Sequence, residues 1–78
     1  MITACQIRAA RALLDWSKQD LADKAIISVN AVARLEKGDV DPRLSTVTAV
    51  EKAIAKAGVI LLPNGDMGEG ARFAKPKR

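Results

Sequence analysis

The chain has 78 residues, of which 49% are hydrophobic and only 3% aromatic. A chain this short buries only about 60% of its unfolded surface, so it has room for one domain and a modest core and excludes a large catalytic cleft. Its net charge of +4 comes entirely from residues 72–78, since residues 1–71 hold nine charges of each sign. The core must therefore be built from Ala, Val, Leu and Ile, which favours closely packed helices, and the overall charge says little about the folded part.

The sequence predicts four helices before residue 59. Each has apolar residues at helical spacing, and most have a recognisable start or end. Ser17 and Ser28 are suitable N-caps for the second and third helices, and Gly38 and Gly58 are natural ends for the third and fourth. The predicted ranges are 3–14, 18–25, 28–37 and 44–57. The residues that form their apolar faces are Ile7, Ala10, Leu14, Leu21, Ala22, Ala25, Val32, Leu35, Leu44, Val47, Val50 and Ile54.

The last part of the chain has a different pattern. Val59–Leu62 is a short run of large apolar residues typical of a strand. The stretch from Pro63 to Gly70 contains an Asn64-Gly65 turn signal, and Ala71–Ala74 can return as a second strand. The sequence therefore predicts a hairpin or ribbon with a basic end.

Catalytic, metal and cofactor sites are not expected. The chain has one cysteine and no histidine, so it forms no internal disulfide and lacks the usual zinc ligand and catalytic base. It shows neither a signal peptide nor the ~18 apolar residues of a membrane span, which makes the cytoplasm the expected compartment. We interpret Cys5 as a small hydrophobic residue, with a redox or metal-binding thiol as the alternative. Without paired carboxylates or a phosphate-binding glycine loop, the protein is not expected to be an enzyme.

The functional interpretation depends on residues 16–38, which predict two short helices joined by a tight turn. The positions that define the pattern are Trp16, Gln19, Leu21, Ala22, Ala25, Ser28, Val32, Leu35, Glu36 and Gly38. This pattern resembles the Xre or lambda-repressor-like helix-turn-helix family over about residues 5–58. The resemblance implies a mainly α fold, namely a helix-turn-helix domain of four to five helices over residues 1–58. A C-terminal strand or hairpin over residues 59–78 would follow it.

The resemblance also implies that the helix over residues 28–37 lies in the major groove of double-stranded DNA. A helix of about ten residues fits this groove, and the inward packing of Val32 and Leu35 leaves four residues on the outer face. Asn30 can pair with adenine and Arg34 with guanine, while small apolar side chains can contact thymine methyl groups. The alternative is an ordinary solvated helix face. The predicted base-contacting residues are Val29, Asn30, Ala33 and Arg34.

Phosphate contacts are expected where helices begin, because free backbone N–H groups and the helix dipole attract an anion there. Three candidates lie at the start of the second helix, and three more occupy matching family positions around the third helix. The alternative for each is a plain cap or a solvated charge. The predicted phosphate-contacting residues are Ser17, Lys18, Gln19, Ser28, Lys37 and Arg43.

Three further expectations follow from comparison with the family pattern. Arg11 and Glu36 match an arginine on the first helix that pairs with a glutamate near the end of the third, with two separate surface charges as the alternative. Ile26 replaces a common glycine at a position that often needs positive φ, so we expect a differently shaped turn. Val29 and Ala31 replace longer polar residues, which indicates that DNA shape shares the recognition.

One helix-turn-helix makes few contacts, and specific binding usually needs two copies on half-sites one helical turn apart. We therefore expect a homodimer, with an interface at Val59, Ile60, Leu61 and Leu62 that the fourth helix can join. The alternative is a hairpin folded on its own core. The basic end, Arg72–Arg78, is either an arm on the DNA backbone or a solubilising tail.

The predicted function is sequence-specific transcriptional regulation. The resemblance implies a dimeric repressor or autoregulator of prokaryotic or phage type that reads a palindromic operator with the helix at residues 28–37. The alternative is an antitoxin or antiactivator that acts mainly by binding a protein partner such as a toxin. The sparse charge on the outer face of the third helix keeps this alternative open.

Overall fold

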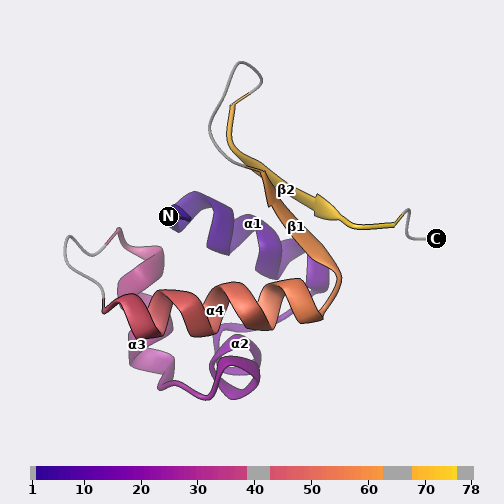
Figure 1. The fold of residues 1–78 in the computed structure, drawn as a ribbon. Helices are drawn as coiled ribbons and strands as arrows, with labels where there is room; N and C mark the ends of the chain where they lie inside the picture. The colour runs from indigo at the N-terminus through magenta and orange to yellow at the C-terminus, as the bar shows by residue number, and fades with distance from the viewer. Residues whose placement is uncertain (1, 39–42, 63–67, 76–78) are drawn as a thin grey trace.

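The computed structural model describes residues 2–38, 43–62 and 68–75. In that part of the chain, a helical domain is followed by a two-stranded antiparallel hairpin (Figure 1). This order confirms the predicted mainly helical fold with a C-terminal hairpin. The predicted Asn64-Gly65 turn and the end of the basic tail lie outside the described residues. The elements are α1 (Ala4–Leu14), α2 (Lys18–Ala25), α3 (Val29–Glu36), α4 (Leu44–Lys56), β1 (Val59–Leu62) and β2 (Gly70–Phe73).

Side-chain caps determine where the first three helices begin. Thr3 and Gln6 form a capping box at α1, and Ser17 and Asp20 form another at α2. The hydroxyl of Ser28 accepts a hydrogen bond from the third residue of α3. Each cap satisfies a backbone N–H that has no partner in the first turn of a helix, so the starts lie where the sequence placed them.

The core consists of small and medium apolar side chains from all four helices and β1. It confirms the predicted inward residues, with two exceptions. Leu14 is only half-buried. The prediction that Leu44 faces the core is wrong, because this residue is 70% exposed. Leu44 is the first residue of α4, and a helical side chain points back toward the N-terminus, here past the end of the packed face. The core residues are Ile7, Ala10, Leu21, Ala22, Ala25, Val32, Leu35, Val47, Val50, Ile54 and Val59.

The hairpin packs against the helices of its own chain, chiefly against α1 (Figure 1). The buried amide of Gln6 donates to the carbonyl oxygens of Leu62 at 2.6 Å and Gly70 at 3.1 Å, and so joins both strands. Val59 is only 2% exposed. The side chain of Val59 therefore does not contact a second copy of the chain as expected, because the core of its own chain encloses it.

The turn between α2 and α3 has the left-handed backbone that suits glycine. Ile26 lies there with φ 58° and ψ 49°, and its side chain is 90% exposed. The expectation of a differently shaped turn is therefore wrong, since Ile26 adopts the left-handed conformation that a glycine would adopt at this position. The left-handed region costs a residue with a side chain about 1–2 kcal/mol, and this side chain regains almost nothing by burial.

The first prediction concerns this turn. Ile26→Gly should raise the free energy of unfolding by about 1 kcal/mol, because relief of the left-handed strain exceeds the extra entropy of glycine in the unfolded chain. Urea denaturation measures the effect. Asp15→Gly is the matched control at φ 57°, and its gain should be smaller because Asp visits this region more readily. A variant less stable than the parent protein would contradict this account.

Candidate nucleic-acid interface

Helix α3 has one face in the core and one in solvent. Val32 is fully buried and Leu35 is 8% exposed, as predicted. Asn30 and Arg34 lie exposed on the opposite face, where Val29 is 38% exposed and Ala33 is half-buried. The four residues expected to contact bases therefore share a face that other molecules can approach.

Helix α1 holds the end of α3 through an ion pair. Nε of Arg11 lies 2.6 Å from Oε2 of Glu36, and Nη2 lies 2.8 Å from Oε1. The Glu36 side chain is 3% exposed and that of Arg11 is 20% exposed. The hydrogen bonds to Glu36 raise the pKa of the Arg11 guanidinium. Nη1 of Arg11 also donates to the carbonyl oxygen of Trp16 at 3.0 Å, so the same side chain ties α1 to the segment before α2.

Arg8 is a second contact between α1 and α3, which the sequence interpretation missed. Its Nη1 donates to the carbonyl oxygen of Glu36, and its Nη2 donates to Sγ of Cys5 at 3.1 Å. A cation at the C-terminal end of a helix stabilises the carbonyl groups that have no partner there. The sequence feature that could have revealed this contact is the spacing of Arg8 and Arg11. Residues three apart lie on the same helix face, so Arg8 faces α3 as Arg11 does.

The start of α2 already contains a carboxylate. Asp20 accepts a hydrogen bond from the backbone N–H of Ser17 at 2.9 Å, and the Ser17 hydroxyl accepts one from the N–H of Asp20 at 3.0 Å. The amide of Gln19 donates to Asp23 at 2.9 Å. Lys18 is exposed. Of the three phosphate candidates here, Lys18 alone brings a positive charge, and the Ser17 hydroxyl keeps its own proton to donate.

The other phosphate candidates lie at the ends of α3 and the start of α4. The Ser28 hydroxyl is engaged as the cap of α3, at 3.1 Å from its donor. Lys37 is exposed at the C-cap of α3, and Arg43 is exposed at the N-cap of α4 without a side-chain cap bond. The structure therefore brings an exposed cation to the start of α2, to the end of α3 and to the start of α4.

The structure also bears on the other candidate sites. Cys5 is exposed on α1 and does not pack as a core residue. Across residues 2–38, 43–62 and 68–75, no three side chains of the metal-binding types come together as a metal site. Within the same ranges, no helix combines the length and apolar character needed to cross a bilayer.

A short helix pair joined by a tight turn, with its second helix presenting a solvent face, defines the helix-turn-helix class of DNA-binding proteins. A family model described as Helix-turn-helix matches residues 7–57, about two thirds of the chain. The chain belongs to this Xre, lambda-repressor-like helix-turn-helix family, whose members are DNA-binding regulators. No curated protein matches the sequence.

The second prediction tests the clamp between α1 and α3. Arg11→Met should lower the free energy of unfolding by about 3–5 kcal/mol, because it leaves the buried Glu36 carboxylate without its partner. The double variant Arg11→Met, Glu36→Leu should be less destabilised than this single variant, since no unpaired charge then stays buried. Urea denaturation of the parent, both single variants and the double variant measures the coupling. If the double variant instead loses the sum of the free energies lost by the two single variants, Glu36 does not depend on Arg11 for its stability in the buried position.

Proposed function

We propose that the protein is a dimeric repressor or autoregulator that reads a palindromic operator by placing α3 in the major groove. The observation that carries this proposal is the exposed outer face of α3 in a chain of this family. Asn30 recognises adenine and Arg34 recognises guanine through paired hydrogen bonds, while Val29 and Ala33 contact thymine methyl groups. Because only Asn30 and Arg34 read hydrogen-bonding patterns, the shape of the DNA supplies part of the specificity.

Contacts to the DNA backbone position α3 in the groove. Lys18, Lys37 and Arg43 neutralise phosphates, and their separation in the fold spreads these contacts around α3. Ser17, Gln19 and Ser28 donate hydrogen bonds from side chains or backbone at helix starts. Asp20 opposes this binding by its charge, which limits the affinity for DNA of any sequence.

Two copies act together in this proposal, each on one half-site, and the protein works in the cytoplasm where its DNA is accessible. An antitoxin or antiactivator that binds a protein partner is the second candidate. The observation in its favour is that Arg34 is the single charged residue among the four on the outer face of α3. Selection of DNA sequences separates the two candidates.

The third prediction is a sequence preference that depends on α3. Selection from random duplex DNA should enrich a palindromic site, and Asn30→Ala or Arg34→Ala should each weaken binding to that site about 5- to 150-fold. Asn30→Ala should leave binding to unrelated duplexes nearly unchanged, because it removes no phosphate contact. Gel shifts at fixed salt measure both affinities.

Lys52→Ala is the control, since Lys52 is exposed on α4 outside the helix-turn-helix. If no duplex is enriched at physiological salt, the regulator proposal fails and the protein-binding candidate replaces it.

The fourth prediction separates phosphate contacts from base contacts. Lys37→Ala should weaken binding to selected and unrelated duplexes by the same factor, and it should reduce the slope of log K against log salt by about 1. Fluorescence titrations at several salt concentrations measure the slope. A loss confined to the selected sequence would instead assign Lys37 to base recognition.

A further inference from the structure

Two arginines of α1 hold the C-terminal end of α3, and each binds a different part of Glu36. Arg11 binds the carboxylate, whereas Nη1 of Arg8 donates to the backbone carbonyl oxygen. The carbonyl oxygen of Leu35 still accepts from a backbone group, the N–H of Gly38 at 3.1 Å. The Glu36 carbonyl is the next along the chain, and there the donor is the side chain of Arg8. Arg8 thus acts at the point where α3 ends.

The two bonds differ in what they fix. Several rotatable bonds join the Glu36 carboxylate to its main chain, so the ion pair with Arg11 tolerates movement of the backbone of α3. The carbonyl that Arg8 binds belongs to the same planar peptide unit as the N–H of Lys37. Arg8 therefore fixes the main chain itself, at the junction between α3 and its C-cap.

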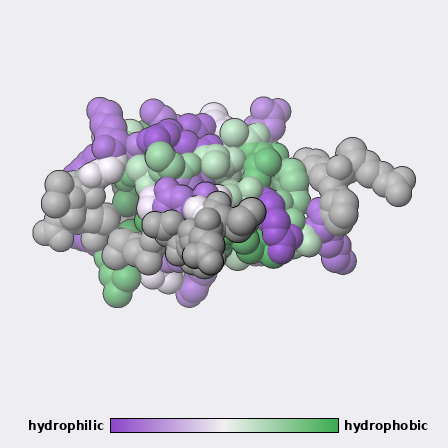
Figure 2. All heavy atoms as spheres, turned by 90° about the horizontal axis from the view of Figure 1, so that it is seen from above, coloured by the Kyte–Doolittle hydropathy of each residue, from purple (hydrophilic) through white to green (hydrophobic). Residues whose placement is uncertain are grey.

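The guanidinium of Arg8 is also held at both of its ends. Exposed polar side chains are common on this protein, and in Figure 2 hydrophilic surface lies above and below the hydrophobic part of the view. Arg8 is exposed as well, but Nη1 donates to the Glu36 carbonyl and Nη2 to Sγ of Cys5 at 3.1 Å. Cys5 lies three residues before Arg8, on the same face of α1. A planar guanidinium with two partners has a fixed direction, which distinguishes Arg8 from a plain solvated charge.

The face of α3 expected to read DNA lies opposite the end that these arginines hold. Each residue turns an α-helix by about 100°, so Arg34, two residues before Glu36, points about 200° away from it. Arg34 is exposed, whereas the Glu36 side chain is buried against α1. A guanidinium recognises guanine through two hydrogen bonds of defined direction, so a small rotation of α3 misaligns both. A lysine bound to a phosphate is a flexible point charge, so it tolerates the same rotation.

We propose that Arg8 is a positioning residue for sequence-specific DNA recognition. By holding the Glu36 carbonyl, it sets the rotation of α3 at which Arg34 reads its base. This role rests on the proposed function of the protein as a regulator that reads DNA with α3. Arg8 acts through α3 and does not itself bind the DNA. Its loss therefore lowers the discrimination between sequences, whereas the loss of a phosphate-binding cation lowers the affinity for every sequence.

The first test compares a selected duplex with an unrelated one. Arg8→Met should raise the dissociation constant for the selected duplex about tenfold, within the range of about 5- to 150-fold expected for loss of the Arg34 contact itself. The dissociation constant for the unrelated duplex and the slope of log K against log salt should change little. Fluorescence titrations measure both at a temperature where circular dichroism shows a folded variant. An equal loss on both duplexes, with the slope reduced by about 1, would overturn the proposal and make Arg8 a phosphate contact.

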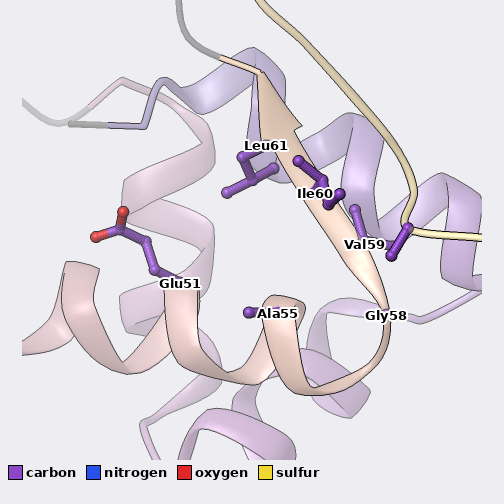
Figure 3. A pocket seen from close by; sticks show the side chains of 7 residues that line it. Glu51, Ala55, Gly58, Val59, Ile60 and Leu61 are labelled. Carbon is purple, nitrogen blue, oxygen red and sulfur yellow. The ribbon is translucent and has the colours of Figure 1, made fainter.

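Lys52→Met is the matched control, because it removes one exposed positive charge from α4. Lys52 follows Glu51, which lines a groove of about 330 Å³ between α4 and β1. Figure 3 shows Leu61 on the side of β1 that faces Glu51. Among the described residues that line this groove, none belongs to α1 or α3. The control variant should therefore bind both duplexes as the parent protein does.

The second test determines whether Arg8 acts through Arg34. In an Arg34→Ala background, Arg8→Met should weaken binding to the selected duplex by about threefold or less, because the contact that it misaligns is already absent. Gel shifts of the parent, both single variants and the double variant at fixed salt measure this coupling. If the two changes weaken binding by independent factors, Arg8 does not position Arg34 and the proposal is wrong.

The third test uses the free protein. Arg8→Met should speed hydrogen exchange at the backbone N–H groups of Lys37 and Gly38, which donate to the last turn of α3. The factor should exceed that at Val50 and Ile54 within α4, where exchange reports unfolding of the whole domain. Exchange measured by NMR resolves the four positions. Equal factors at all of them would mean that Arg8 contributes only to overall stability, which overturns the proposal.

The outcomes distinguish the role of Arg8 from the function on which it rests. If no duplex is enriched from random DNA, the regulator and the role of Arg8 in it are both overturned. If a duplex is enriched and Arg8→Met binds it as tightly as the parent protein does, the role of Arg8 alone is overturned.

Discussion

The pairing of Arg11 with Glu36 is the interaction on which the presentation of α3 depends. The Glu36 carboxylate is almost closed off from solvent, and a carboxylate in that position is tolerated only when its oxygens are paired. Arg11 supplies two donors to it, and Arg8 holds the backbone carbonyl of the same residue. Because α3 has only eight residues and short helices are marginal by themselves, its orientation comes from these contacts and from its buried face.

Helix α1 thereby contacts both the recognition helix α3 and the C-terminal hairpin. The side of its N-terminal turn that carries Gln6 holds the two strands of the hairpin, and Arg8 and Arg11 further along hold α3. Two copies can match two half-sites only if the surface that joins them is fixed relative to the helix that binds DNA. One helix that contacts both parts, over a core of small closely packed side chains, provides that fixed relation.

Two residues of the helix-turn-helix carry a cost, one in function and one in stability. Asp20 stabilises the start of α2 by capping, yet its charge lies where a phosphate is expected to bind. Ile26 holds a left-handed backbone at a cost, and its exposed side chain does not offset that cost by packing. In both places the residue suits one requirement of the helix-turn-helix and conflicts with another.

The sequence by itself determined the helices, the strand and the class of protein. Caps such as Ser17 and Ser28 and apolar spacing act within one or two turns, so these features can be recognised locally. The tertiary structure alone decided that Arg8 reaches the end of α3 and that Gln6 joins the two strands of the hairpin. Arg8 and Glu36 are 28 residues apart, and Gln6 and Leu62 are 56 apart. Such partners are chosen by the packing of whole elements, which no local pattern encodes.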